Sequence, residues 1–75
     1  MFEPRSLAPA KGVVAEFDYE RGLGVVESED GTRWPFHCTA IADGSRNINV
    51  GTVVAWSVRM GRLGRWEAAE ITPIA

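Results

Sequence analysis

This 75-residue chain has few of the features that mark secreted, membrane or metal-binding proteins. It holds one cysteine, which excludes an internal disulfide and favours a reducing compartment. One cysteine and one histidine are too few for the three or four ligands of a zinc site within one chain. The first ten residues contain Glu3, Pro4 and Pro9 and no apolar run, so we expect neither a signal peptide nor a membrane anchor there. These absences predict a cytoplasmic protein without a metal or other cofactor.

The chain also lacks an excess of positive charge. Eight Lys and Arg residues stand against ten Asp and Glu residues, which gives a formal net charge of −2. No long-range field would therefore draw the whole molecule toward phosphate groups or anionic lipids. Any affinity for nucleic acid must come from a local patch of side chains.

Sequence patterns of common enzymes are missing as well. Gly22-Leu23-Gly24 lacks the third glycine and the following helix of a dinucleotide-binding fingerprint, and no segment resembles a phosphate-binding P-loop. His37 and Cys38 are adjacent, and neighbours on a strand point to opposite faces, so we expect that they do not pair as base and nucleophile. The sequence predicts a protein that is not an enzyme.

What the sequence does contain is a series of short β-rich runs separated by glycines, which is typical of a small all-β barrel or sandwich. A chain of this length forms one domain. Residues 1–10 show no periodicity and predict a flexible tail before a domain of residues 11–75. We expect no helix beyond a short turn near residues 39–42. The five runs are Gly12–Phe17, Leu23–Ser28, Arg33–Cys38, Thr52–Arg59 and Arg65–Thr72.

Glycines between the runs predict two hairpins. Asp30-Gly31, between the second and third runs, supplies the positive φ angles of a tight hairpin turn, so these two strands should pair antiparallel. Gly61 and Gly64, between the fourth and fifth runs, predict a second and longer hairpin loop.

Side-chain alternation assigns residues to the core. Val54, Trp56 and Val58 share one side of their run, and we expect this trio to face inward. Trp34 and Phe36 likewise share one side of the third run. This inward set is large enough to fill the interior of a closed barrel.

The same alternation predicts which residues point outward. Pro35 and His37 lie opposite the aromatic pair of the third run. If Val26 is in the core, Leu23 and Val25 point to the solvent as well. The sequence therefore predicts an outward face that carries Leu23, Val25, Pro35 and His37.

Several short motifs follow one another in a fixed order along the chain. They are GVVAEFD at 12–18, RGLGVV at 21–26, DG at 30–31, WPFH at 34–37, TAI at 39–41, Gly51, and Gly61 to Gly64. This order resembles that of the cold-shock domain family over roughly residues 12–71. The family typically has G-x-V-K-W-F-N, K-G-F-G-F-I, D-G, V-F-V-H, S-A-I, a glycine before the fourth strand and a G-x-x-G loop before the fifth. The resemblance implies a five-stranded antiparallel OB-fold barrel that binds single-stranded RNA or DNA on its first three strands and acts in RNA handling or gene regulation.

Carried over position by position, the resemblance implies that Phe17, Arg21 and His37 keep the aromatic, basic and histidine positions of the binding face. Four other positions have lost a ring: Glu16 in place of a tryptophan, and Leu23, Val25 and Pro35 in place of phenylalanines. Stacking one base on an aromatic ring contributes about 1–3 kcal/mol. The implied binding is therefore weak and low in sequence specificity.

The second hairpin offers a possible compensation. Arg59, Arg62 and Arg65 surround it, and Trp66 follows directly. A basic loop beside an aromatic ring has the chemistry that binds single strands. A solvated loop with a tryptophan packed at the end of the barrel gives the same pattern. The candidate nucleic-acid-binding residues are Phe17, Arg21, Leu23, Val25, Pro35, His37, Arg59, Arg62, Arg65 and Trp66.

A second function stays open at this point. Leu23, Val25 and Pro35 are also suited to form an apolar patch for a protein partner or a second copy of the chain. The two hypotheses make different predictions. Nucleic-acid binding should be sensitive to salt, whereas self-association should depend on protein concentration.

Overall fold

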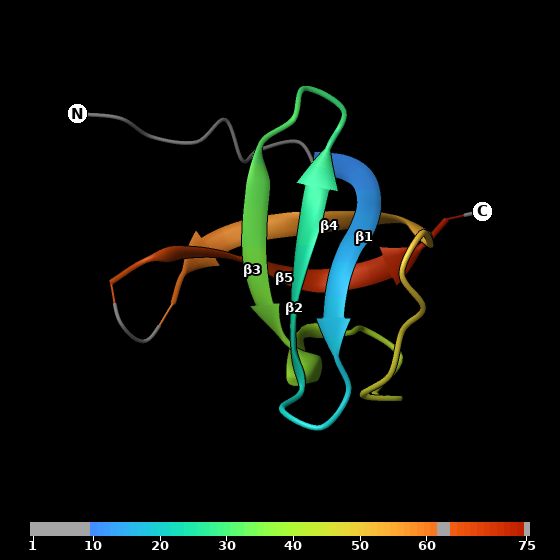
Figure 1. The fold of residues 1–75 in the computed structure, drawn as a ribbon. Coiled ribbons are helices and arrows are strands. Elements are labelled where there is room, and N and C mark those ends of the chain that lie inside the picture. Colours follow the sequence, from blue (N-terminus) through green and yellow to red (C-terminus); the bar gives the residue numbers. More distant parts are fainter. Residues whose placement is uncertain (1–9, 62–63, 75) are drawn as a thin grey trace.

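The computed structural model describes residues 10–61 and 64–74, which form a five-stranded antiparallel sheet and one short 3₁₀ helix (Figure 1). The strands agree closely with the five predicted runs, and the 3₁₀ helix lies near the predicted turn. The predicted tail lies outside the described residues except for Ala10, where the first strand begins. The elements are β1 (Ala10–Asp18), β2 (Leu23–Ser28), β3 (Arg33–His37), η1 (Cys38–Ala40), β4 (Val53–Met60) and β5 (Trp66–Pro73).

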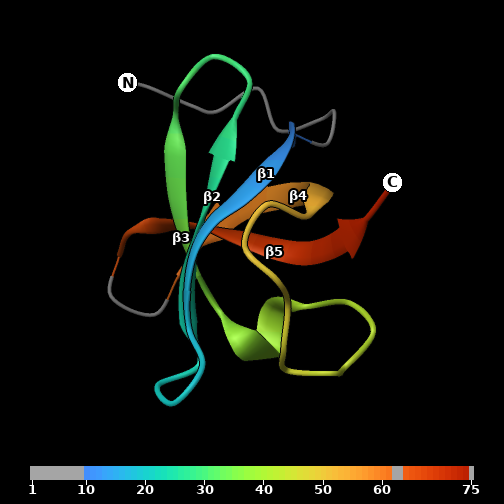
Figure 2. The same ribbon diagram turned by 45° about the vertical axis from the view of Figure 1, so that its right-hand side comes forward.

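The strands lie in the order β3-β2-β1-β4-β5, and each neighbouring pair is antiparallel. The sheet curls, so that β1, β2 and β3 cross in front of β4 and β5 (Figures 1 and 2). β3 contacts β5, and a parallel bridge joins Ile41 to Ile71. No hydrogen-bonded ladder between β3 and β5 closes the sheet within residues 10–61 and 64–74. The predicted all-β antiparallel fold is confirmed to this extent.

The hairpin between β2 and β3 differs in detail from the predicted turn. Ser28 N–H donates to the Thr32 carbonyl at 2.8 Å, and Gly31 N–H donates to the Ser28 carbonyl at 2.9 Å. This pattern is a three-residue loop, in which a type I turn is followed by one residue with positive φ. Gly31 is that residue, with φ of 90°. The Asp-Gly pair therefore uses one positive φ angle, because the longer loop needs only one.

β1 contains a bulge that the sequence pattern does not predict. The register pairs of β1 and β2 are Val14–Val26, then Glu16–Val25, Phe17–Gly24 and Asp18–Leu23. Ala15 is the extra residue of the bulge. Before Ala15 the even-numbered residues of β1 face inward, and after it the odd-numbered residues do. As a result, Glu16 points outward with Val25, while Phe17 lies opposite Gly24 on the inner side.

The core lies inside the curled sheet. Val54 and Trp56 are buried, and Val58 packs against them half-buried. Phe36 is buried and Trp34 is half-buried on the same inner side of β3. The predicted inward set is therefore confirmed. In the described part of the chain, no helix is long and apolar enough to cross a membrane.

Candidate functional site

The outward residues of β1, β2 and β3 form two rows across the strands, which we call the outer face. One row is Glu16–Val25–Pro35 and the other is Asp18–Leu23–His37. Leu23 is 47% exposed, Pro35 and His37 are exposed, and Val25 is half-buried. The predicted outward orientation of these four residues is confirmed. Pro35 fits here because β3 is an outer strand of the sheet order, where a missing N–H is tolerated.

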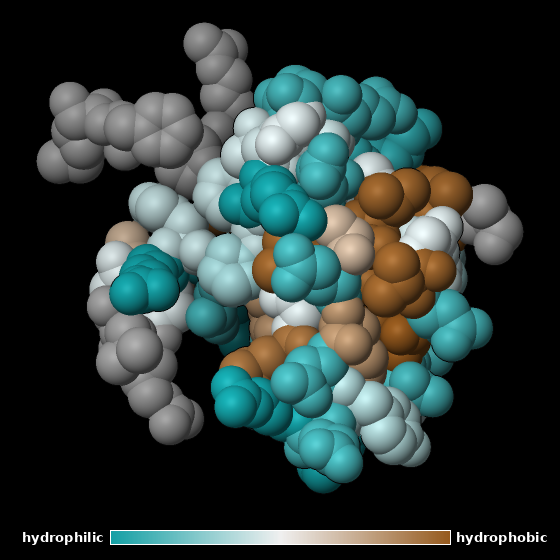
Figure 3. Space-filling view, viewed as in Figure 1, coloured by the Kyte–Doolittle hydropathy of each residue, from teal (hydrophilic) through white to brown (hydrophobic). Residues whose placement is uncertain are grey.

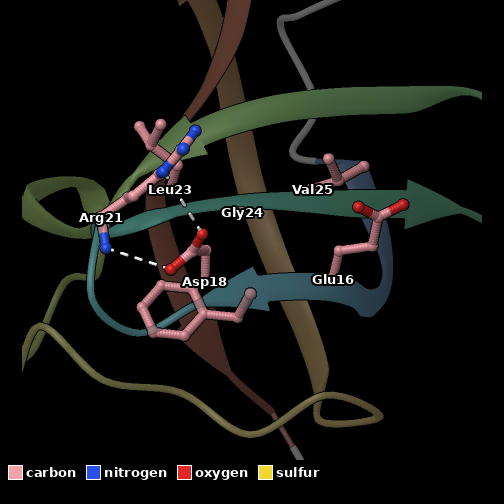
Figure 4. A pocket seen from close by; sticks show the side chains of 7 residues that line it. Glu16, Asp18, Arg21, Leu23, Gly24 and Val25 are labelled. Carbon is pink, nitrogen blue, oxygen red and sulfur yellow. Dashed lines mark hydrogen bonds and ion pairs between the residues drawn. The ribbon is translucent and has the colours of Figure 1, made fainter.

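An open groove of about 300 Å³ runs over β1 and β2 on this side of the molecule (Figure 4). Glu16 and Val25 lie beside each other at one end, and Asp18 lies with Arg21 and Leu23 at the other. The lining residues are Glu16, Phe17, Asp18, Arg21, Leu23, Gly24 and Val25. The structure therefore brings four of the predicted site residues together, from β1, from β2 and from the turn between them.

Phe17 differs from the other predicted site residues because it faces inward. Its ring stacks on Phe36 with centroids 5.9 Å apart and an interplanar angle of 11°. The ring is half-buried and also lines the groove. Gly24 leaves room for this contact, since a Cβ at Gly24 would lie 2.5 Å from Phe36 Cζ. Phe17 thus packs under the sheet and presents one side to the groove.

The arginine at the turn between β1 and β2 is paired with an acid. Arg21 N–H donates to Asp18 Oδ1 at 3.1 Å, and Arg21 Nε lies 3.7 Å from Asp18 Oδ2 (Figure 4). Both side chains are exposed. The predicted cation is therefore present at the groove, but it is paired with the carboxylate of Asp18.

Sequence reasoning missed a second arginine. Arg33 Nη2 lies 3.2 Å from Glu16 Oε2, and Arg33 Nε lies 3.3 Å from Glu27 Oε1. Arg33 therefore joins carboxylates on β1 and β2 from its place on β3. Alternation along β3 offered one signal, because it sets Arg33 on the same side as Pro35 and His37. The approach of Glu16 depends on the bulge in β1.

His37 is held by the turn that follows it. Thr39 N–H donates to His37 Nδ1 at 3.2 Å, and Thr39 Oγ1 lies 3.0 Å from the same nitrogen. The side chain therefore caps η1. Because a backbone N–H donates to Nδ1, the proton of the neutral ring sits on Nε2.

The expectation that His37 and Cys38 point to opposite faces of one strand is wrong. Cys38 Sγ lies 3.8 Å from His37 Nδ1. Cys38 begins η1 and does not continue β3, so strand alternation does not apply to it. Thr39 contacts Nδ1 more closely than the thiol does. That the protein is not an enzyme stays a prediction.

The second hairpin emerges on the β3 side of the molecule (Figures 1 and 2). Arg59 is exposed on β4 opposite Glu67, and Arg65 is exposed directly before β5. Trp66 is half-buried at the start of β5, opposite Met60. Arg62 lies outside the described residues. None of the described hairpin residues lines the groove.

The surface over the strands is mixed in character. Figure 3 shows small brown areas separated by teal ones, and a larger brown area on the side where β5 ends. Val13 pairs with Val53 across β1 and β4, and Ile74 N–H donates to the Val53 carbonyl at 3.0 Å. All three residues are exposed, so they form a second apolar area beyond the groove.

Within residues 10–61 and 64–74, no three His, Cys, Asp or Glu side chains gather as potential metal ligands. No model of a known protein family matches the sequence, and no curated protein matches it.

Proposed function

We propose that this chain is an OB-fold domain of the cold-shock type that binds single-stranded RNA or DNA on the outer face. Support for the fold comes from the strand order, in which β1 joins two halves of one curled sheet, and from the contact between β3 and β5. OB-folds are partly open five-stranded barrels that bind oligonucleotides around strands two and three. The lack of a closing ladder is compatible with such a barrel.

The outward placement of Leu23, Val25, Pro35 and His37 carries the proposal for binding. Their side chains leave an apolar surface next to a histidine, with Arg21 at its end. Bases stack on such surfaces while cations contact the phosphates. Leucine, valine and proline offer apolar contact without a π-system, so the binding is weak. Apolar contact of this kind distinguishes bases poorly, so sequence preference is low.

A direct test uses fluorescence anisotropy with fluorescein-labelled dT and U oligomers at about 50 mM and about 200 mM salt. We expect binding that weakens at the higher salt. Absence of binding in both conditions would contradict the proposed function.

Two variants locate the site in the same assay. Leu23 and Ile74 are each 47% exposed, but only Leu23 lies on the outer face. Leu23→Glu should lower the affinity by about tenfold, because it removes apolar contact and adds a charge that repels phosphate. Ile74→Glu adds the same charge beside Val53, so its affinity should stay close to that of the parent protein. Equal losses in both variants would show that the outer face is not the binding surface.

The second candidate function is protein association, and the apolar area of Val13, Val53 and Ile74 favours it. Sedimentation equilibrium over a wide concentration range tests whether this chain associates with a second copy of itself. Association that Ile74→Glu abolishes would support this candidate, and a strictly monomeric protein would count against it.

A further inference from the structure

Two exposed arginines of the outer face each lie against carboxylates. Arg33 reaches Glu16 and Glu27, and Arg21 reaches Asp18. Glu16 and Asp18 are both on β1 and both point outward. The outer face therefore carries a cation and a carboxylate at each end of the groove.

The path of Arg33 places its charge close to the groove. Arg33 is on β3, Glu16 is on β1, and β2 lies between these strands. Arg33 lies opposite Glu27 on β2, and its guanidinium group reaches past this strand to Glu16, which lies opposite Val25. The guanidinium group thus lies next to the apolar surface that the proposed function assigns to bases.

The two acids that pair with these arginines, Glu16 and Asp18, lie close together on β1. Glu16 and Asp18 are two residues apart on one strand, which corresponds to about 6.6 Å. Successive phosphates of an extended single strand have a comparable separation. A guanidinium group binds phosphate with the same two-pronged geometry that it uses for a carboxylate.

Exposed ion pairs of this kind are weak, because water and salt screen them and because both side chains lose freedom in forming them. An incoming phosphate therefore needs to displace only a weak partner from each arginine. The displaced carboxylate stays nearby and repels the phosphate.

We propose that Arg33 and Arg21 are the phosphate-binding residues of the outer face, and that Glu16 and Asp18 occupy them as competing anions when no strand is bound. This inference rests on the proposed function. It adds Arg33 to the site and gives the two acids a role, since they set the affinity by competing with the ligand.

The test compares four variants by anisotropy titration with a fluorescein-labelled dT oligomer at low salt. Glu16→Gln combined with Asp18→Asn should raise the affinity by about tenfold, because each arginine loses one competing charge while Glu27 stays beside Arg33. Arg33→Gln should lower the affinity several-fold and reduce the magnitude of the salt slope by about 0.7. Arg33→Lys keeps the charge and should retain most of the slope.

Glu29→Gln is the matched control, since Glu29 is exposed in the loop between β2 and β3 and outside the groove. It removes one negative charge where the double acid variant removes two, and it should change the affinity only slightly. Circular dichroism verifies that each variant is folded.

The outcomes distinguish failure of the competition model from failure of the proposed function. If the parent protein binds and neither the double acid variant nor Arg33→Gln differs from the control, the competition model is wrong and the proposed function stands. If neither the parent protein nor the double acid variant binds in any salt, the proposed function itself fails. If the parent protein binds, the double acid variant binds more tightly and Glu29→Gln does not, the competition model is supported.

Discussion

At Leu23, Val25 and Pro35 the chain presents aliphatic side chains on a surface where aromatic rings would stack with bases. These side chains offer a base little contact area and have no π-face. They keep the surface apolar, however, and they leave the groove open over β2. Under the proposed function, we expect single residues on this face to determine how strongly an oligonucleotide binds, and the arrangement of the strands to determine where it binds.

This view predicts that adding a ring strengthens binding. Val25→Phe should raise the affinity for a dT oligomer by about fivefold or more, because one stacked base contributes about 1–3 kcal/mol. Val53→Phe is the matched control, since Val53 is outside the groove. The measurement is the anisotropy titration. An equal gain from both substitutions would show that the ring acts through nonspecific apolar contact and not through this site.

At the scale of the element, the β2–β3 hairpin depends on one ionised side chain. The Ser28 hydroxyl donates to Asp30 Oδ1, and Thr32 N–H donates to the same oxygen at 3.0 Å. These hydrogen bonds, the one from Ser28 first, lower the pKa of Asp30 from 3.8 to about 2. The turn thus favours the charged carboxylate, even though it is fully exposed.

The sign of the pH dependence follows from this lowered pKa. The unfolded chain takes up the proton at higher pH than the folded chain, so the contribution of Asp30 to stability is present above about pH 4. It is lost as the pH falls through the folded-state pKa near 2. Asp30→Asn should therefore lower the Tm at neutral pH, and this difference from the parent protein should shrink between pH 4 and pH 2. A constant difference in thermal unfolding across this range would contradict the assignment.

Much of the fold was predictable from the sequence because period-two alternation and glycine punctuation act locally. Val26 and Phe36 face inward, and Leu23 and His37 face outward, as the pattern predicts. The bulge at Ala15 was not predictable, because valine, alanine and glutamate are all compatible with regular strand pairing. That one extra residue places Phe17 on the inner side of the curled sheet and Glu16 within reach of Arg33. The contact between Cys38 and His37 escaped prediction for a similar reason, since the strand ends one residue earlier than expected.

For the whole molecule, the negative net charge limits how any nucleic acid is held. With a formal net charge of −2, attraction to phosphate depends on local cations, such as Arg21 and Arg33 near the groove. Association should therefore be local and short-ranged, without the steering that a basic protein provides.

The salt dependence of binding measures how many of these arginines take part. Two phosphate contacts on a single strand predict a slope of log K against log salt of about −1.4. A fourfold increase in salt should then weaken binding by about sevenfold. Titrations at several salt concentrations give this slope directly. A slope near zero would exclude phosphate contacts, and a much steeper slope would require cations beyond Arg21 and Arg33.

The most direct test of the central claim is an NMR titration of the amide signals with a short single-stranded oligonucleotide. We expect the shifted signals to belong to the outer face and its arginines, namely Arg21, Leu23, Val25, Arg33 and His37. Signals shifted only around Arg59, Arg65 and Trp66 would move the site to the second hairpin. The absence of any shift at low salt, or shifts confined to Val53 and Ile74, would contradict the claim that the outer face binds nucleic acid.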